Sequence, residues 1–241
     1  LIFSLIIFAQ TPKQIFKEAN NNYQAQEYSS AVDNYENLLG KGYQSAEIYY
    51  NLGNAYFKLN DIPSAILYYE KAKKIDPSDE DIDFNLRIAN LQTVDKIEPL
   101  PKLFYQEWYE SLSRGISSGK WAFIAITCSF ISVILLVIFV MIDNSFIKKA
   151  SFAVGIISII IMILSIIIGF DAHSYNTKSD TAIIFAESIY VKSSPDGEST
   201  KLFMLHEGTK VEIIDDVGEW YEIKIANGNV GWLPINAIQK I

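Results

Sequence analysis

The sequence predicts a multidomain membrane protein in which an all-α repeat array and a small all-β barrel flank two transmembrane helices. Residues 121–142 and 150–170 contain no charged side chain, and each run reaches the roughly 20 apolar residues that a helix needs to cross a bilayer. Before the first run, similar residues recur 34 positions apart, which is the length of a helix-turn-helix repeat. From residue 181 onward apolar and polar residues alternate, as they do in short strands.

Residues 1–10, LIFSLIIFAQ, are predicted to be the remnant of a secretory signal peptide. Their apolar run ends at a small residue, Ala9, before polar sequence begins, which is the pattern of a signal peptide near its cleavage site. On this interpretation the residues that follow are exported. A buried core strand is the alternative interpretation of the same run.

Residues 11–94 are predicted to form helical repeats followed by a capping helix. The second copy places small residues where paired helices meet and a proline where its second helix ends. The first copy matches less well, and the third supplies a single helix that we expect to shield the last apolar face. The second copy resembles the tetratricopeptide repeat at eight positions: Tyr49, Leu52, Gly53, Tyr56, Ala65, Tyr69, Ala72 and Pro77.

The concave face of such a short array is the first candidate binding site. Tyr50, Asn54 and Phe57 are expected to line it in the second copy. In peptide-binding repeats of this type an asparagine at the place of Asn54 contacts the ligand backbone, and Asn20 is its equivalent in the first copy. Two solvated polar positions are the alternative. Because Phe16 and Tyr50 stand where a carboxylate clamp needs lysine, recognition of a C-terminal carboxylate is not expected.

Residues 95–120 are predicted to be a linker and an interfacial helix. Phe104, Trp108, Leu112 and Ile116 recur every four residues and give the helix one apolar face. Aromatic residues beside a span, with basic residues nearby, are typical of a helix that lies in the headgroup layer. A helix packed on the last repeat is the alternative.

The two spans, 121–142 and 150–170, are predicted to form a hairpin that anchors the protein. Residues 143–149 form its turn and carry Lys148 and Lys149, which favours a cytoplasmic turn. Both soluble modules would then face the periplasm from the inner membrane. A pore or transporter usually needs a buried ionisable residue, and neither run contains one.

Residues 171–180 are predicted to be a tether, and residues 181–241 a small barrel with turns near Pro195, Gly208, Gly218 and Gly228. The order of its landmarks, which include Leu205, Gly208, Trp220, Gly231 and Trp232, resembles a bacterial SH3-like domain. Relatives of that domain bind peptides or cell-wall material, and core burial is the alternative role of Trp220 and Trp232. The candidate ligand groove consists of Tyr190, Trp220, Tyr221 and Trp232.

Composition and motifs argue against several classes of function. The net charge is -8, and an acidic protein repels the phosphate backbone, so nucleic acid is not an expected partner. The sequence holds one cysteine, Cys128, so an intrachain disulfide is impossible. His206 has no second histidine or cysteine nearby, and no nucleophile, metal or phosphate-loop motif is found. We therefore expect no enzyme activity, cofactor or metal.

The order of parts, together with the segment NLRIANLQTVDKIEPLP at 85–101, resembles the BatE-type component of the Bacteroides aerotolerance (Bat) operon. The resemblance implies an inner-membrane scaffold that works beside von Willebrand factor A-type Bat proteins and an AAA+ ATPase, with a role in oxygen or stress tolerance. The alternative is an envelope sensor or peptidoglycan-binding module that acts through the SH3-like domain.

Overall fold

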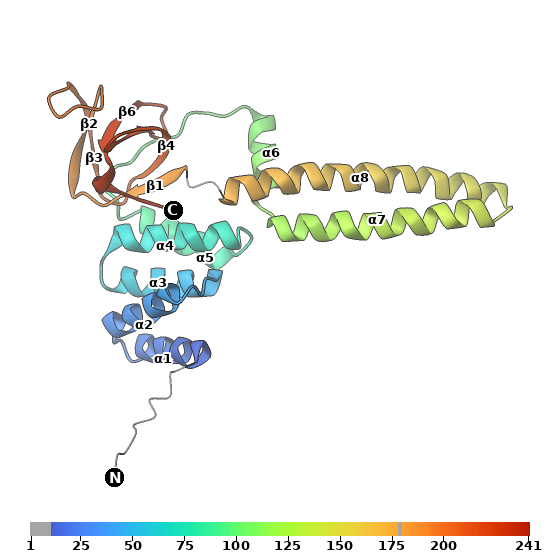
Figure 1. Ribbon diagram of the computed structural model, residues 1–241, viewed down its shortest axis with the longest axis horizontal. Coiled ribbons are helices and arrows are strands. Elements are labelled where there is room, and N and C mark those ends of the chain that lie inside the picture. The colour runs from blue at the N-terminus through green and yellow to red at the C-terminus, as the bar shows by residue number, and fades with distance from the viewer. Residues whose placement is uncertain (1–10, 178–179) are drawn as a thin grey trace, which may run out of the picture. The chain divides into compact units, whose positions relative to one another are not determined.

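The computed structural model describes residues 11–177 and 180–241, so the predicted signal remnant at 1–10 lies outside the described residues. The chain forms two compact units. One unit holds the helical repeats, residues 79–101 and the C-terminal sheet, and the other holds residues 76–78 and 102–177. The second unit is therefore an insertion between two parts of the first (Figure 1).

Five helices form the repeat array and stack in chain order (Figure 1). Side chains cap several of them: Thr11 and Gln14 form a capping box, the Ser45 hydroxyl accepts from the Ile48 amide, and Asp79 accepts from the Ile82 amide. The predicted helical repeats are thus confirmed. The helices are α1 (Pro12–Gln24), α2 (Tyr28–Gly40), α3 (Ala46–Lys58), α4 (Ile62–Ile75) and α5 (Glu80–Asn90).

Small residues set the distance between paired helices. Ala31 and Ala65, which occupy equivalent places in the two copies, are fully buried. A Cβ atom on Gly53 would lie 2.7 Å from Cδ1 of Tyr69, so the Tyr69 ring lies directly on the backbone of α3. The glycine therefore allows α3 and α4 to approach closely.

The C-terminal sheet has seven strands in the order β3-β2-β6-β5-β4-β1-β7, and every pairing is antiparallel. Glycines at positive φ stand at three of the expected turns, Gly208, Gly218 and Gly228. The strands are β1 (Thr181–Ile184), β2 (Ser188–Lys192), β3 (Lys201–His206), β4 (Lys210–Val217), β5 (Trp220–Lys224), β6 (Val230–Pro234) and β7 (Ile238–Lys240), with a 3₁₀ turn at Ile235–Ala237.

The sheet packs directly on the last repeat. Ile183 of β1 and Ile241 share one apolar cluster with Ile66 of α4 and Leu86 of α5. We expected α5 alone to shield the last apolar face of the array. The structure shows that the sheet covers α4 as well, through the contacts of Ile66 with Ile183 and Ile241 in this cluster.

The segment after α5 connects the two modules. The Asp95 carboxylate accepts hydrogen bonds from the amide of His206 (2.7 Å) and the hydroxyl of Thr209 (2.7 Å), and its second oxygen lies 2.9 Å from Nδ1 of His206. Ile97 packs against the core of the sheet. Residues 95–101, predicted as linker, are therefore part of the interface between the modules.

A second polar contact crosses the same interface. Nζ of Lys210 lies 2.7 Å from Oε2 of Glu70.

Burial raises the pKa of the Asp95 carboxyl, but hydrogen bonds from Thr209 and His206 outweigh this effect, so its pKa lies below the ordinary value. The carboxylate is thus the favoured form in the folded state, and it stabilises the packing of the two modules.

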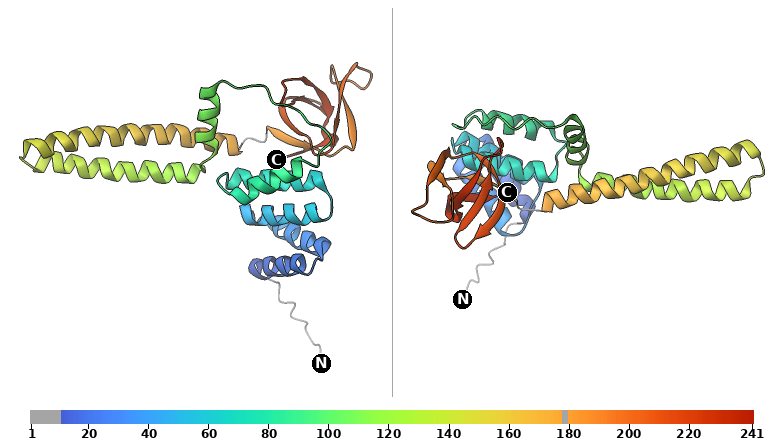
Figure 2. Two further views of the ribbon diagram at one scale, coloured as in Figure 1. Left: turned by 180° about the vertical axis from the view of Figure 1, so that it is seen from behind. Right: turned by 90° about the horizontal axis from the view of Figure 1, so that it is seen from above.

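The inserted unit is a helical hairpin with one helix across its end. It consists of α6 (Phe104–Arg114), α7 (Ser118–Met141) and α8 (Ser145–Thr177). Both α7 and α8 are long and apolar enough to cross a membrane. In Figures 1 and 2, α6 runs across the axis of the hairpin. It contacts α8, and the Tyr109 hydroxyl lies 3.3 Å from Oδ2 of Asp171.

Two predicted boundaries in this unit are wrong. The turn was expected at 143–149, but α8 already begins at Ser145, where the Asn144 side chain accepts from the amides of Phe146 and Ile147. A tether was expected at 171–180, but α8 continues through Thr177. Polar side chains do not end a helix by themselves, and 171–177 contains neither proline nor glycine.

We predict that Asp95→Asn loosens the C-terminal module from the repeats. Loss of the charge weakens three contacts to a partly buried carboxylate, each worth about 1 to 3 kcal/mol. Hydrogen exchange of the full-length protein in detergent should become roughly tenfold faster in the peptide that spans 201–210. Asp33→Asn, at an exposed position on α2, is the matched control and should leave exchange unchanged.

The pH dependence follows from the lowered pKa of Asp95. The contribution of Asp95 is complete above the unfolded pKa of about 3.9 and is lost as the pH falls through the folded value. The wild-type protein should therefore lose protection at 201–210 below about pH 4, whereas Asp95→Asn should lack this acid-sensitive component. Equal acid sensitivity in both proteins would contradict this role of Asp95.

Candidate functional site

The concave side of the repeats contains a cavity of about 280 Å³. The predicted residues Tyr50, Asn54 and Phe57 line it from α3. Four residues of α1, α4 and α5 complete the wall together with Lys58 at the end of α3: they are Tyr23, Tyr69, Asn85 and Ile88. The structure thus brings three of the four predicted groove residues together, and adds a cation at their edge.

The fourth residue, Asn20, lies in the equivalent place one repeat earlier and outside this cavity. Its Oδ1 accepts hydrogen bonds from the hydroxyl of Tyr35 and from Nδ2 of Asn51. The carbonyl oxygen of Asn20 is therefore occupied by two donors. It joins three successive helices, α1, α2 and α3.

The same arrangement recurs 34 residues later around Asn54. Its Oδ1 accepts from the hydroxyl of Tyr69 (2.7 Å) and from Nδ2 of Asn85 (2.8 Å). In both copies the tyrosine follows the asparagine by 15 residues and the second amide follows by 31. We call these two sets, Asn20–Tyr35–Asn51 and Asn54–Tyr69–Asn85, the asparagine ladder.

The ladder fixes the orientation of the Asn54 amide in the groove. Its carbonyl oxygen is occupied by two donors, whereas Nδ2 makes no hydrogen bond with any residue that the structure describes. Nδ2 is therefore a preorganised donor. Burial raises the pKa of Tyr35 to about 12 and also raises that of Tyr69, so both phenols remain protonated donors at neutral pH.

The sequence itself carries a signal for the asparagine ladder. Asn51 and Asn85 are 34 residues apart, as are Asn20 and Asn54. The equivalence of Asn20 and Asn54 was expected, but that of Asn51 and Asn85 was not. A polar residue that recurs at the repeat period indicates a repeated hydrogen bond between neighbouring helices.

The predicted aromatic groove of the C-terminal module is divided between two faces of the sheet. Tyr221 packs against the core, so its assignment to the groove is wrong. Trp232 pairs with Lys192 of β2 and Glu222 of β5, and these residues alternate with the buried Val191, Ile223 and Leu233. Trp232 therefore lies on the outer face of the sheet.

The outer face carries the other two predicted aromatics. Tyr190 and Trp220 alternate with buried neighbours in β2 and β5, and both are at least partly exposed. Nζ of Lys192 lies 5.6 Å from the centre of the Trp220 ring, and Nζ of Lys201 lies 4.4 Å from that of Tyr190. We call Tyr190, Trp220 and Trp232 with these two lysines the aromatic face. Trp220 and Trp232 are partly buried on this face, so the alternative of a role in packing stays open for both.

Comparison with known families identifies both soluble modules. Residues 46–79 match the model of the tetratricopeptide repeat, and residues 187–235 match that of the bacterial SH3 domain. The first match covers α3 and α4, and the second covers β2 to β6. A comparison with curated proteins finds no match. The domain composition is therefore established at the level of these two modules.

We predict that Asn85→Ala destabilises the repeats through the ladder. The change removes donors to Oδ1 of Asn54 and to the hydroxyl of Tyr50, and it should lower the free energy of unfolding by about 1 to 2 kcal/mol. Urea unfolding of the full-length protein in detergent, followed by circular dichroism, measures this loss. Asn37→Ala, on the exposed side of α2, is the control. Equal effects of the two changes would argue against the ladder.

Proposed function

We propose that the protein is an inner-membrane-anchored interaction scaffold whose repeat groove binds an extended segment of a partner protein. The observation that carries this proposal is the Asn54 amide, which is held by two hydrogen bonds and presents a free N–H donor to the groove. A fixed donor of this kind suits a backbone carbonyl of an extended peptide, because little conformational entropy is lost on binding.

The other residues of the groove define the chemistry of the peptide. Phe57 and Ile88 offer apolar contact, and Lys58 is an exposed cation at the edge of the groove. A peptide with an apolar side chain close to an acidic one complements the apolar Phe57 and Ile88 and the basic Lys58. The groove lacks the lysines of a carboxylate clamp, which supports an internal segment of the partner as the ligand.

The hairpin supports the membrane part of the proposal. In α6, Phe104 and Trp108 are 83% and 67% exposed, and the helix runs across the axis of the two apolar helices. A helix in this orientation, with exposed aromatics, suits the headgroup layer if α7 and α8 cross the bilayer. Because α6 contacts α8 and belongs to the inserted unit, the alternative of a helix packed on the last repeat is not favoured.

Orientation in the membrane follows from charge. Lys148 and Lys149 at the start of α8 favour a cytoplasmic position of the turn. A hairpin returns the chain to the side from which it started, so the repeats and the SH3 domain would both face the periplasm. The resemblance to BatE-type proteins adds a partner class, the von Willebrand factor A-type Bat proteins, and a role in oxygen or stress tolerance.

The aromatic face supports a second candidate function, the binding of peptidoglycan. The exposed Tyr190 ring and the partly exposed Trp220 and Trp232 rings offer flat apolar surfaces next to lysine donors, and both kinds of group suit a glycan that carries peptides. Co-sedimentation of the full-length protein in detergent with purified sacculi, lost on Trp232→Ala, would favour this function. Without sedimentation this candidate is excluded.

We predict that Lys58→Glu weakens partner binding at least tenfold. The change reverses the charge at the groove, so it replaces attraction of an acidic side chain by repulsion. Recovery of a purified von Willebrand factor A-type Bat protein on the immobilised full-length scaffold measures the effect. Lys41→Glu also places an acid at an exposed position at the end of a helix, α2, but outside the groove. It therefore controls for the effect of an acid on the helix dipole. Equal binding by the two variants would remove the groove from the proposal.

We predict that both soluble modules are accessible from the periplasm. In spheroplasts an added protease should degrade epitopes attached near Lys41 and near Gly197, whereas a cysteine placed at Ser145 should react only after the membrane is made permeable. The Cys128→Ala background removes the single native thiol. Protection of both epitopes would reverse the proposed orientation.

A further inference from the structure

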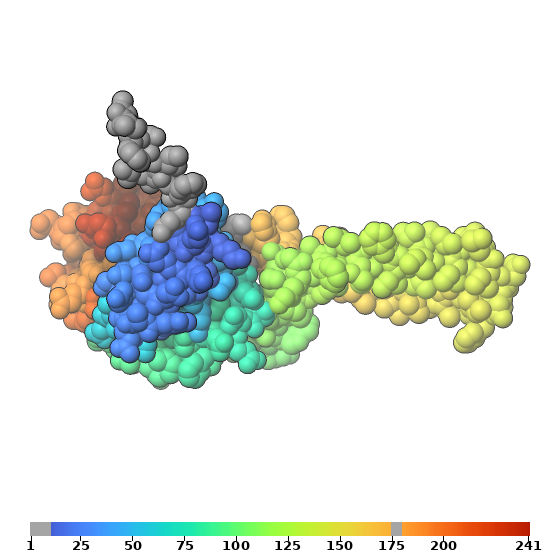
Figure 3. Space-filling view, turned by 90° about the horizontal axis from the view of Figure 1, so that it is seen from below, coloured from blue at the N-terminus to red at the C-terminus, as the bar shows by residue number. Residues whose placement is uncertain are grey.

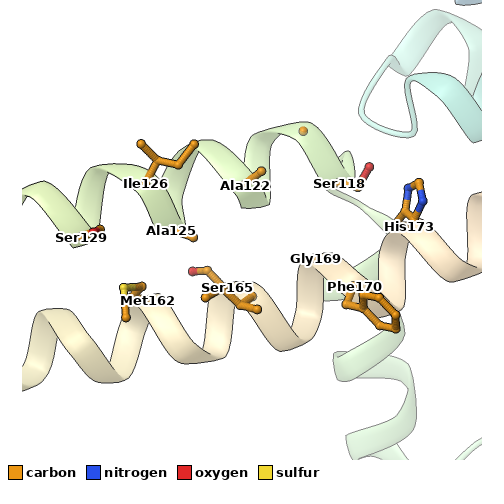
Figure 4. A pocket seen from close by; sticks show the side chains of 12 residues that line it. Ser118, Ala122, Ala125, Ile126, Ser129, Met162, Ser165, Gly169, Phe170 and His173 are labelled. Atoms are coloured by element: carbon orange, nitrogen blue, oxygen red, sulfur yellow. The ribbon is translucent and has the colours of Figure 1, made fainter.

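The apolar surface of the hairpin does not select one kind of occupant. Exposed apolar side chains form most of the surface of α7 and α8, part of which is visible in Figure 3. A groove of about 660 Å³ between the two helices is lined mainly by small and apolar residues (Figure 4). Lipid chains cover such surfaces in a membrane as readily as a protein does. The C-terminal sheet differs, because a segment of the chain is seated on it.

Residues 93–100, which we call the strap, lie along the C-terminal sheet (Figures 1 and 2). Near the start of the strap, the Asp95 carboxylate accepts hydrogen bonds from the amide of His206 and the hydroxyl of Thr209, in the turn between β3 and β4. Two residues later, Ile97 packs against the core of the sheet. The strap is thus held by one polar and one apolar side chain.

Glycines allow the strap to approach the sheet at both of its ends. A Cβ atom on Gly208 would lie 2.8 Å from Cγ2 of Thr93, and one on Gly228 would lie 2.9 Å from Cδ1 of Leu100. The amide of Leu100 also donates to the carbonyl of Ala226, at 3.1 Å. The strap therefore contacts two turns, the one between β3 and β4 and the one between β5 and β6.

The strap is bound as an extended peptide and not as a strand of the sheet. Thr93, Asp95 and Ile97 are partly buried, whereas the residues that separate them are exposed. This alternation is typical of an extended chain that lays one side on a surface. The strap belongs to none of the seven strands of the sheet, and irregular segments join it to α5 and α6. It can therefore leave the sheet without the unfolding of a strand.

The two soluble modules have further contacts with each other that use no residue of the strap. Ile66 of α4 packs with Ile183 and Ile241, and Lys210 pairs with Glu70. Release of the strap would therefore leave the modules in contact. It would also free roughly 25 Å of extended chain between α5 and α6.

The contacts of the strap define which segments the surface beneath it can accept. Without the strap, the His206 amide and the buried Thr209 hydroxyl lose their acceptor, so the emptied surface favours a carboxylate. The area under Ile97 suits an apolar side chain, and the carbonyl of Ala226 suits a backbone amide. The matching pattern is an aspartate, an apolar residue two positions later and a leucine five positions later.

We propose that the strap is an intramolecular ligand, and that the surface beneath it is a binding site for an extended segment of a partner protein with the same pattern. The chain's own segment closes this site in the structure. A partner that displaces the strap binds to the sheet and lengthens the connection to α6. The site shares no residue with the repeat groove or the aromatic face, so the proposal depends neither on those surfaces nor on the placement of the hairpin in a membrane.

Binding of a strap peptide added in trans tests the proposal. A fluorescent peptide with the sequence of residues 92–102 is titrated with the full-length protein in detergent, and its anisotropy is measured. The double variant Asp95→Asn with Ile97→Ser, in which the protein's own strap is disabled, should bind the peptide about tenfold more tightly than the wild type. The reason is that a tethered strap competes at a roughly millimolar effective concentration. A peptide with the same two substitutions should not bind.

A matched pair of substitutions locates the bound peptide. In the double variant, Thr209→Val keeps the shape of the side chain but removes the hydroxyl that bonds Asp95, so it should weaken peptide binding about tenfold. Thr200→Val makes the same change at an exposed position before β3 and should leave binding unchanged. Equal effects of the two changes would overturn the assignment of the site.

A milder variant keeps the test decisive if circular dichroism shows that the double variant does not fold. Leu100 is 57% exposed, so Leu100→Asp weakens one end of the strap and leaves Asp95 and Ile97 in place. It should bind the peptide about threefold more tightly than the wild type. Equal binding by the wild type and the folded variant, or no binding by either, would overturn the proposal. A wild-type dimer that the variant cannot form would assign the strap to a second copy and would also overturn it.

Discussion

The contact of Tyr69 with Gly53 is the constraint on which the repeat module depends. The ring lies on the backbone of α3, and any larger residue at position 53 would separate the two helices. At the other end of the same side chain, the hydroxyl holds Oδ1 of Asn54. One tyrosine therefore sets both the distance between the helices and the orientation of an amide in the groove. Helix packing and the orientation of the Asn54 amide are coupled, because a shift of α4 would move the Tyr69 hydroxyl that bonds Oδ1 of Asn54.

The sheet extends this coupling to the other end of the chain. Ile66 of α4 packs with Ile183 and Ile241 in a shared cluster, so the helix that carries Tyr69 is supported on one side by α3 and on the other by the C-terminal module. Asp95 and His206 join the segment after the repeats to a turn of the same sheet. Because the two modules form one compact unit, the chain leaves and re-enters a single body around the hairpin. If α7 and α8 cross a bilayer, as proposed, their two passes meet this requirement, whereas a single pass would place the modules on opposite sides.

The sequence was sufficient to predict the helices and strands, but not which of them pack against one another. Gly53, Ala65 and Pro77 indicate a helical repeat because their sizes and conformations are specific to its geometry, and the glycine turns of the sheet are as specific. The packing of Ile183 on α4 could not be predicted, since an apolar strand residue fits the core of its own sheet equally well. Tyr221 was misplaced for a related reason: alternation defines two faces of a strand, and which face is buried depends on the register with neighbours.

In the hairpin, too, the sequence does not reveal which side chains pack against a neighbouring helix. In a soluble helix, polar residues mark the exposed side, and periodicity reveals the buried one. Almost every position of α7 is apolar, so no such contrast exists, and the sequence alone cannot tell the face that meets α8 from the face that stays exposed. The packing of Trp121 and Leu135 on α8 resolves the first face. Other positions, among them Phe123, Ile126, Thr127 and Ile134, stay exposed, so side-chain packing, and not periodicity, defines the two faces of α7.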